Sequence, residues 1–156
     1  RVLSEDFDVV VHVDEELMRQ VFLNLALNAF DAMGDTGELR VSVAVRPNHL
    51  PPEVVVRFID EGDGIDEDTA ARIFEPFFTT KPNGTGLGLP MAHRVVTNHD
   101  GQLRARSVDG GGAEFSVHLP LVGLFRDGHL ITGDEALEAL AADASHASVD
   151  SAEGTA

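Results

Sequence analysis

The stretch from residue 15 to residue 33, EELMRQVFLNLALNAFDAM, limits the possible folds of this chain more than any other feature. It consists almost entirely of good helix formers and stops at Gly34, so it predicts a helix. Asp14 stands immediately before it as a candidate N-cap. Because the segment is apolar on most of its sides, we expect the helix to be buried.

Three polar residues interrupt this apolar helix on one face. Asn24, Asn28 and Asp31 are spaced four and three residues apart, which places them in line along the helix. A buried amide costs free energy unless its donors and acceptors are paired. Either the stripe is hydrogen-bonded to a neighbouring loop, or a carboxamide oxygen ligates a hard cation such as Mg²⁺. The residues alone leave both interpretations open.

Strands and shorter helices are predicted along the rest of the chain as far as Pro120. β-Branched residues and apolar–polar alternation predict strands over residues 7–13, 38–46, 53–60, 102–107 and 114–119, and helix signals predict helices over residues 66–74 and 87–98. The second and third of these strands are expected to form a hairpin. Residues 75–88, with two prolines and adjacent phenylalanines, predict a long mobile loop.

Composition excludes several classes of function. Acidic residues outnumber basic ones 27 to 11 over 156 residues, and the formal charge of −16 disfavours contact with nucleic acid or an anionic membrane. The chain lacks cysteine, so disulfides and Cys-ligated metal sites are excluded. No apolar run is long enough to span a bilayer. We therefore expect a cytoplasmic domain, whether or not its parent protein is attached to a membrane.

The segment from Asp60 to Ile65, DEGDGI, is the second candidate site. An aspartate at the end of an apolar strand can accept a hydrogen bond from an exocyclic amine, and Gly62 and Gly64 allow the backbone to approach a flat ring. The alternative is a plain acidic turn.

Three alternate glycines, Gly84, Gly86 and Gly88, open the helix predicted to follow the loop. Such a segment can direct backbone N–H groups and a helix N-terminus at a phosphate, or it can be a flexible linker. Lys81, the only lysine in the chain, lies between the two glycine-rich motifs. Its ammonium could meet a terminal phosphate, or it could be solvated in the loop.

Taken in order, the segments NLALNAFDA, DEGDGI, FEPFFTTK and GTGLGL resemble the N box, first glycine box, F box and second glycine box of sensor histidine kinases. The resemblance runs from about residue 7 to residue 121. It implies the ATP-binding domain of the gyrase, chaperone, histidine-kinase and mismatch-repair ATPase superfamily, known as the Bergerat fold. That fold is a two-layer α/β (α+β) sandwich, with helices on one face of a mixed β-sheet and a mobile ATP lid. We expect this domain over residues 1–121 and an acidic, partly disordered extension over residues 122–156.

The resemblance implies a role for residues in each box. Asp60 would bind the adenine amine, Asn28 would bind Mg²⁺, and Lys81 would contact the terminal phosphates of ATP. Asn24 and Lys81 are the implied catalytic residues. The full set implied to bind ATP comprises Asn24, Asn28, Asp31, Asp60, Gly62, Gly64, Ile65, Phe74, Lys81, Gly84, Thr85, Gly86, Leu87 and Gly88.

The identity of residue 24 indicates the type of enzyme. In the superfamily's ATPases and anti-sigma-factor serine kinases, a glutamate acting as general base stands four residues before the Mg²⁺-binding asparagine. Here that position holds Asn24, whose amide cannot accept a proton from water or serine near neutral pH. A neutral histidine is already nucleophilic. The resemblance therefore implies a histidine protein kinase that donates the γ-phosphoryl group of Mg-ATP.

The chain lacks a recognisable acceptor histidine. In the family this histidine lies in a helix and is followed by an acidic residue and soon by a proline, a context that none of the seven histidines has. The implied partners are a histidine-bearing dimerisation domain, upstream or on another chain, and a response regulator. In isolation we expect ATP binding and little phosphotransfer.

Two alternatives to the kinase hypothesis remain. One is a nucleotide-sensing, non-catalytic docking module that contacts a partner through Phe77 and Phe78. The other is an anti-sigma-type serine kinase, which Asn24 and the F box disfavour. A further departure from the family is Ala113 after Gly112, where a threonine usually supports the adenine pocket.

The extension after residue 121 is acidic and falls outside the resemblance. Residues 133–144 predict one short helix, and residues 145–156 predict disorder. The extension could dock on a response regulator or solubilise the end of the domain.

Overall fold

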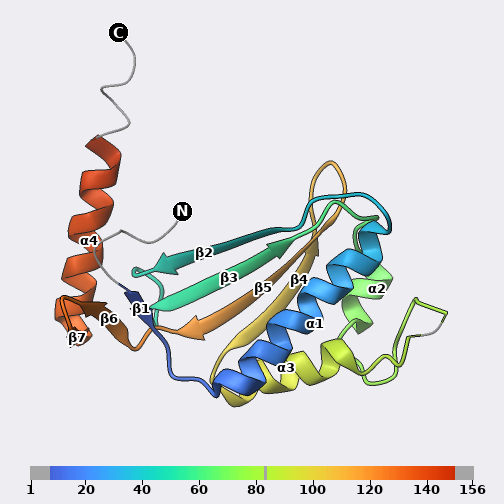
Figure 1. Ribbon diagram of the computed structural model, residues 1–156, viewed down its shortest axis with the longest axis horizontal. Coiled ribbons are helices and arrows are strands. Elements are labelled where there is room, and N and C mark those ends of the chain that lie inside the picture. The colour runs from blue at the N-terminus through green and yellow to red at the C-terminus, as the bar shows by residue number, and fades with distance from the viewer. Residues whose placement is uncertain (1–7, 83, 150–156) are drawn as a thin grey trace, which may run out of the picture.

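The computed structural model describes residues 8–82 and 84–149 (Figure 1). The elements follow one another as β1 (Asp8–Val10), α1 (Glu15–Met33), β2 (Arg40–Arg46), β3 (Glu53–Ile59), α2 (Glu67–Arg72), α3 (Gly88–Asn98), β4 (Gln102–Ser107), β5 (Ala113–Pro120), β6 (Gly123–Arg126), β7 (His129–Thr132) and α4 (Gly133–Val149). No helix in the described ranges is both long and apolar enough to cross a membrane.

Four strands form the main sheet in the order β2-β3-β5-β4. The predicted hairpin is confirmed, with Arg46 opposite Glu53 where the two strands meet the loop. Every pairing described in this sheet is antiparallel, which differs in one detail from the mixed sheet that the resemblance implied. The remaining strands form a second, separate sheet in the order β1-β6-β7.

The helices α1 and α3 cover one face of the main sheet (Figure 1). The core between the layers is built from side chains such as Val21 and Leu25 of α1, Val96 of α3, Phe58 of β3 and Val117 of β5. Full burial of such a side chain contributes roughly 1.5–3 kcal/mol to folding. The predicted two-layer sandwich with helices on one face is confirmed.

Local signals set the ends of these helices. The Asp14 carboxylate accepts a hydrogen bond from the Leu17 N–H at 3.0 Å, and α1 stops at Gly34 as predicted. Asp66 caps α2 in the same way, and its hydrogen bonds from Thr69 hold the pKa of Asp66 below its usual value.

The expectation of a fully buried α1 is wrong. Leu23, Leu27 and Phe30 are 58%, 52% and 53% exposed, while Leu25 and Ala29 are buried. The reason is that α1 meets the sheet and α3 with one face only, and the exposed residues follow a helical spacing on the outer face.

The extension is more ordered than its sequence indicated. Asp127 and Gly128, both with positive φ, turn the chain between β6 and β7, and α4 continues to Val149 beyond the predicted end at residue 144. Leu124 and Leu140 pack there with Val9 and Val45, so the extension contacts both β1 and β2. Residues 150–156 and Phe7 lie outside the described residues, and the division at residue 121 stays a prediction.

Candidate functional site

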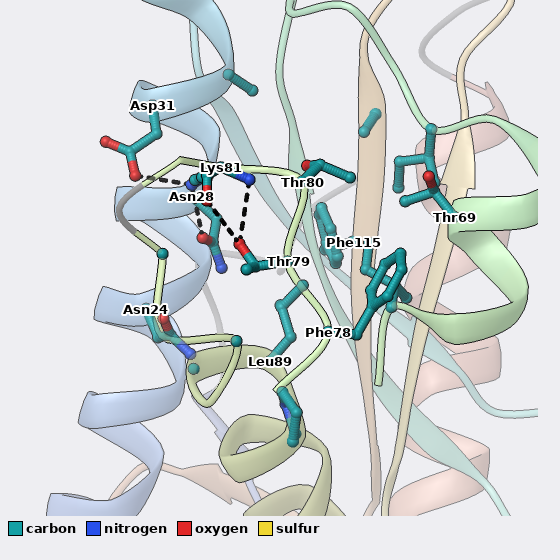
Figure 2. A pocket seen from close by; sticks show the side chains of 18 of the residues that line it. Asn24, Asn28, Asp31, Thr69, Phe78, Thr79, Thr80, Lys81, Leu89 and Phe115 are labelled. Atoms are coloured by element: carbon teal, nitrogen blue, oxygen red, sulfur yellow. Dashed lines mark hydrogen bonds and ion pairs between the residues drawn. The ribbon is translucent and has the colours of Figure 1, made fainter. Parts of the chain in front are cut away.

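A cavity of about 290 Å³ opens between α1, α2, α3 and the segment before α3 (Figure 2). Its volume is near the lower end of the range of small-molecule sites, roughly 300–1,000 Å³. Eleven of the residues predicted to bind ATP line it: Asn24, Asn28, Asp31, Asp60, Gly64, Ile65, Lys81, Gly84, Thr85, Gly86 and Gly88. Segments up to 64 positions apart, from Asn24 to Gly88, thus meet in one place.

Asp60 follows the last residue of β3 and is only 2% exposed. Its Oδ1 accepts two backbone hydrogen bonds, from the Gly62 N–H at 2.9 Å and the Ala113 N–H at 3.1 Å. In the described part of the chain no buried side-chain nitrogen or oxygen lacks a partner. Among these residues the second oxygen, Oδ2, has no donor and must therefore be accessible, and Asp60 lines the cavity. One carboxylate oxygen fixes the loop, and the other can accept from a ligand donor.

The walls beside Asp60 are apolar and held by backbone contacts. Ile65 is bound twice to Ser107, whose Oγ accepts from the Ile65 N–H at 2.8 Å and donates to its carbonyl at 2.6 Å. Gly64 has φ +81°, and a Cβ there would lie 3.0 Å from the Gly112 carbonyl oxygen. Together with Phe115, these residues form a narrow apolar site next to one acceptor, which suits a flat heteroaromatic ring that carries an amine.

Charged and amide groups gather at the other side of the cavity. Asn28 and Asp31 project from α1 toward Lys81, whose Nζ donates to Asn28 Oδ1 at 3.1 Å and to Asp31 Oδ2 at 2.7 Å (Figure 2). Two oxygens one helical turn apart therefore converge on a single positive charge. The Lys81 ammonium stands where these oxygens could hold a metal ion.

The ligand atoms at this point are of a type that Mg²⁺ accepts, but the protein supplies few of them. An amide oxygen and a carboxylate oxygen are ligands that Mg²⁺ accepts. The residues described contain no group of three or more His, Cys, Asp or Glu that could hold a metal. A cation here would need most of its shell from water and from phosphate oxygens of a ligand, as Mg²⁺ commonly does.

The start of α3 closes the cavity against α1. A Cβ on Gly88 would lie 2.5 Å from Asn24 Oδ1, so the two helices approach this closely only because residue 88 is glycine. Leu87 precedes the helix without a side-chain cap, and the first-turn N–H groups of α3 are left for water or a ligand. Pro90 lies in that first turn, where a proline is tolerated.

The segment before α3 is folded back on itself. The Phe77 N–H donates to the Gly86 carbonyl at 2.8 Å, and the Lys81 N–H donates to Thr79 Oγ1 at 3.1 Å. Phe77 has φ +69° and is 75% exposed, a costly conformation for a bulky residue. Phe78 lines the cavity instead.

Three predicted residues lie outside the cavity lining. Gly62 packs on Ala32 and bonds to Asp60, Phe74 stacks on His93 with ring centroids 5.0 Å apart, and Leu87 is partly exposed. The lining also includes residues that were not predicted, namely Ala32, Thr69, Ile73, Phe78, Thr79, Thr80, Leu89, Pro90, Ala113 and Phe115. Helical spacing of Thr69 and Ile73, and alternation along β5, could have pointed to some of them.

The model of the histidine kinase-, DNA gyrase B- and HSP90-like ATPase family matches residues 13–123. The chain belongs to this family. Membership confirms the resemblance seen in the four boxes and supports ATP as a ligand of the domain.

The relatives are sensor histidine kinases. The chain is 38% identical over 111 residues to the signal transduction histidine-protein kinase AtoS of Escherichia coli K12, which covers 71% of this chain and 18% of that protein. The chain therefore spans less than a fifth of the length of this relative.

Solved structures of histidine kinases are similar to this chain in fold and in sequence. The catalytic domain of histidine kinase ThkA in a nucleotide-free form has a TM-score of 0.63 at 31% identity, and the match covers 72% of this chain and 73% of that one. Full-length ShkA in complex with AMPPNP has a TM-score of 0.62 at 31% identity, covering 73% of this chain and 23% of that one. By fold and family, residues 13–123 are a histidine-kinase catalytic domain.

Proposed function

We propose that this chain is the phosphoryl-donating domain of a two-component sensor histidine kinase. It binds Mg-ATP and transfers the γ-phosphoryl group to a histidine on a dimerisation domain that the chain does not contain. The observation that carries the proposal is that the two oxygens of Asp60 differ: Oδ1 accepts from two backbone N–H groups, and Oδ2 accepts from no donor in residues 8–82 and 84–149.

Adenine is the ligand group that suits this arrangement. Its exocyclic amine donates to an acceptor such as Asp60 Oδ2, and its flat faces pack against Ile65 and Phe115, which line the same cavity. A charge-assisted hydrogen bond of this kind contributes about 1.5–3 kcal/mol. Binding of the ATP analogue AMPPNP by the similar protein ShkA supports the choice of an adenine nucleotide.

The phosphates would lie at the side of the cavity that holds Asn28, Asp31 and Lys81. Asn28 Oδ1 is the proposed Mg²⁺ ligand, and Mg²⁺ would neutralise charge on the phosphate oxygens. Lys81 would then leave its partners on α1 and direct its ammonium at the terminal phosphates. Its present contacts are consistent with this change, because the side chain is 41% exposed and unobstructed by the core.

The carboxylates that line the cavity are already bonded to other groups, which disfavours hydrolysis of ATP by water as the main reaction. Asp60 is bound by backbone donors, Asp31 is paired with Lys81, and residue 24 is an amide. No free general base therefore stands in the cavity among the described residues. A neutral histidine needs none to attack the γ-phosphorus, so the chain's part is to hold the nucleotide in position.

The proposed partners follow from this chemistry and from the relatives. A helical dimerisation domain supplies the acceptor histidine, in cis or in trans, and a response regulator receives the phosphoryl group afterwards. We place the domain in the cytoplasm, where ATP is available.

Calorimetric titration of the chain with ATP, with and without Mg²⁺, tests the proposal. Wild type should bind saturably and more tightly with Mg²⁺, and Asn28→Ala should abolish the Mg²⁺ dependence. Asn98→Ala, at the far end of α3, is the matched control and should leave both curves unchanged. Failure of the folded wild type to bind ATP, or unchanged metal dependence in Asn28→Ala, would refute the assignment.

A further inference from the structure

The main sheet has a second face that no described helix covers, and this face is basic. Antiparallel register places directly opposed residues on the same face, so the residues that share it can be read from the pairing. They are Arg40, Ser42, Ala44 and Arg46 of β2, Glu53, Val55, Arg57 and Ile59 of β3, Glu114, Ser116, His118 and Pro120 of β5, and Gln102, Arg104 and Arg106 of β4.

The charge of this face is opposite to that of the whole chain. Five arginines against two glutamates leave +3 on the face, with His118 counted as neutral. Since the chain carries −16, the residues outside the face together carry −19. Half of the ten arginines therefore lie on one side of one sheet. Solubility depends on the net charge and does not require positive charge to be gathered on one face, so this distribution needs another explanation.

Four of the five arginines are paired with a carboxylate, three of them at 3.5 Å or less. Arg106 binds Glu114 through two nitrogens at 3.2 and 2.7 Å, Arg46 lies 3.3 Å from Glu53, and Arg40 lies 3.5 Å from Glu38.

Arg57 has the longest of these pairings, and Arg104 has no carboxylate partner among the described residues. Arg57 approaches Glu114 only to 3.9 Å. In residues 8–82 and 84–149 the side chain of Arg104 bonds only to Gln102 Oε1, at 3.0 and 2.7 Å. The two arginines flank Ser116 on adjacent strands, about 10 Å apart at the backbone.

Three buried polar residues beside these two arginines form a hydrogen-bonded network. His118 contacts Glu53 Oε1 through Nδ1 and Ser116 Oγ through Nε2, each at 3.1 Å. All three residues are buried. Because Glu53 is occupied by His118 and Arg46, it cannot neutralise the two central arginines. A shallow hollow on this face is lined by Arg46, Arg57, Arg104 and Arg106 around Ser116 and His118.

We propose that this basic sheet face is a docking surface for an acidic segment of a partner protein. Guanidinium groups bind carboxylates through two parallel hydrogen bonds. Arg104 bonds only to an amide oxygen and Arg57 pairs only with a carboxylate 3.9 Å away, so both retain N–H groups for a further carboxylate. A nucleic acid or an anionic membrane is a poorer match, because each extends beyond the face and meets the −19 on the rest of the chain. A short acidic segment contacts the face alone.

Fluorescence anisotropy with a labelled octaglutamate peptide tests the proposal on the full chain. At an ionic strength of about 20 mM, where the Debye length is roughly 20 Å, wild type should bind saturably, and an octaglutamine peptide should not bind. Arg57→Ser/Arg104→Ser should weaken binding about 10-fold or more. The control Arg19→Ser/Arg94→Ser removes the same charge from α1 and α3 and should change affinity less than about 2-fold.

Circular dichroism should show the same fold for all variants, since none of the changed side chains belongs to the apolar core. Three results would overturn the proposal. They are no saturable binding by folded wild type, an equal loss in both double variants, and tighter Arg57- and Arg104-dependent binding of a single-stranded DNA oligonucleotide or of phosphatidylserine vesicles. Arg57- and Arg104-dependent self-association in sedimentation would also overturn it, by assigning the face to a second copy of the chain.

Discussion

Two substitutions of Asp60 should separate its structural role from its binding role. Asp60→Asn keeps Oδ1 as the acceptor for the Gly62 and Ala113 N–H groups, and turns Oδ2 into a donor. The free energy of unfolding should therefore change by less than about 1 kcal/mol. The loss of one charge-assisted hydrogen bond, about 1.5–3 kcal/mol, should weaken ATP binding about 10- to 160-fold.

Asp60→Ala should affect both properties. It leaves the two backbone N–H groups without an acceptor in a site where Asp60 is 2% exposed. An unsatisfied buried donor costs about 1–3 kcal/mol, so the variant should be destabilised by about 2–6 kcal/mol.

Urea denaturation gives the unfolding free energies, and calorimetry gives the ATP affinities, for wild type and both variants. Wild-type ATP affinity in Asp60→Asn would show that the purine is recognised elsewhere. Equal stability of Asp60→Ala and Asp60→Asn would show that the two backbone hydrogen bonds do not hold the loop.

Further predictions concern the cation position, the contact between α1 and α3, and the buried histidine. Lys81→Met should raise the affinity of the nucleotide-free chain for Mn²⁺, measured by electron paramagnetic resonance, while weakening ATP binding; unchanged Mn²⁺ affinity would mean that the ammonium does not occupy the metal position. Gly88→Ala puts a Cβ 2.5 Å from Asn24 Oδ1 and forces the Asn24 side chain to turn away, so it should weaken ATP binding more than it lowers stability in urea, and unchanged ATP affinity would contradict the role of Asn24. Burial is the largest cause that lowers the pKa of His118, helped by nearby arginines and opposed by Glu53, so its folded pKa lies below the unfolded value of about 6.5. The stability that neutral His118 provides is complete above about pH 6.5 and is lost as the pH falls toward the folded pKa, and His118→Gln should flatten this dependence in denaturation measured from pH 7 to pH 5.

The sequence was most informative where local chemistry determines the structure. Asp14 begins α1 and Gly34 ends it as predicted, because caps depend on neighbouring residues. The polar stripe on α1 lines the cavity, since helical spacing alone puts Asn28 and Asp31 on one face, and both bond to Lys81 of the neighbouring segment.

Contacts between segments far apart in the chain could not be predicted from the sequence. Nothing in the residues indicated that Ser107 would hold Ile65, 42 positions away, or that α1 would cover the sheet with only one face. The Asp127–Gly128 turn was a readable hairpin signal that was missed.

At Ala113 the residue type did not indicate the contact, because the backbone makes it. Its side chain departs from the family's threonine, but its backbone N–H supplies a bond to Asp60 that any residue except proline could make.

Phosphotransfer tests the central claim most directly. The chain is incubated with γ-labelled ATP, Mg²⁺ and a separately supplied dimerisation domain that carries the acceptor histidine. The account predicts label on that domain, stable to base and labile to acid as expected of phosphohistidine, and lost with Asn28→Ala. Normal ATP binding without transfer to any supplied domain would contradict it and favour a nucleotide-sensing docking module, and label on a serine would assign the chain to the serine kinases.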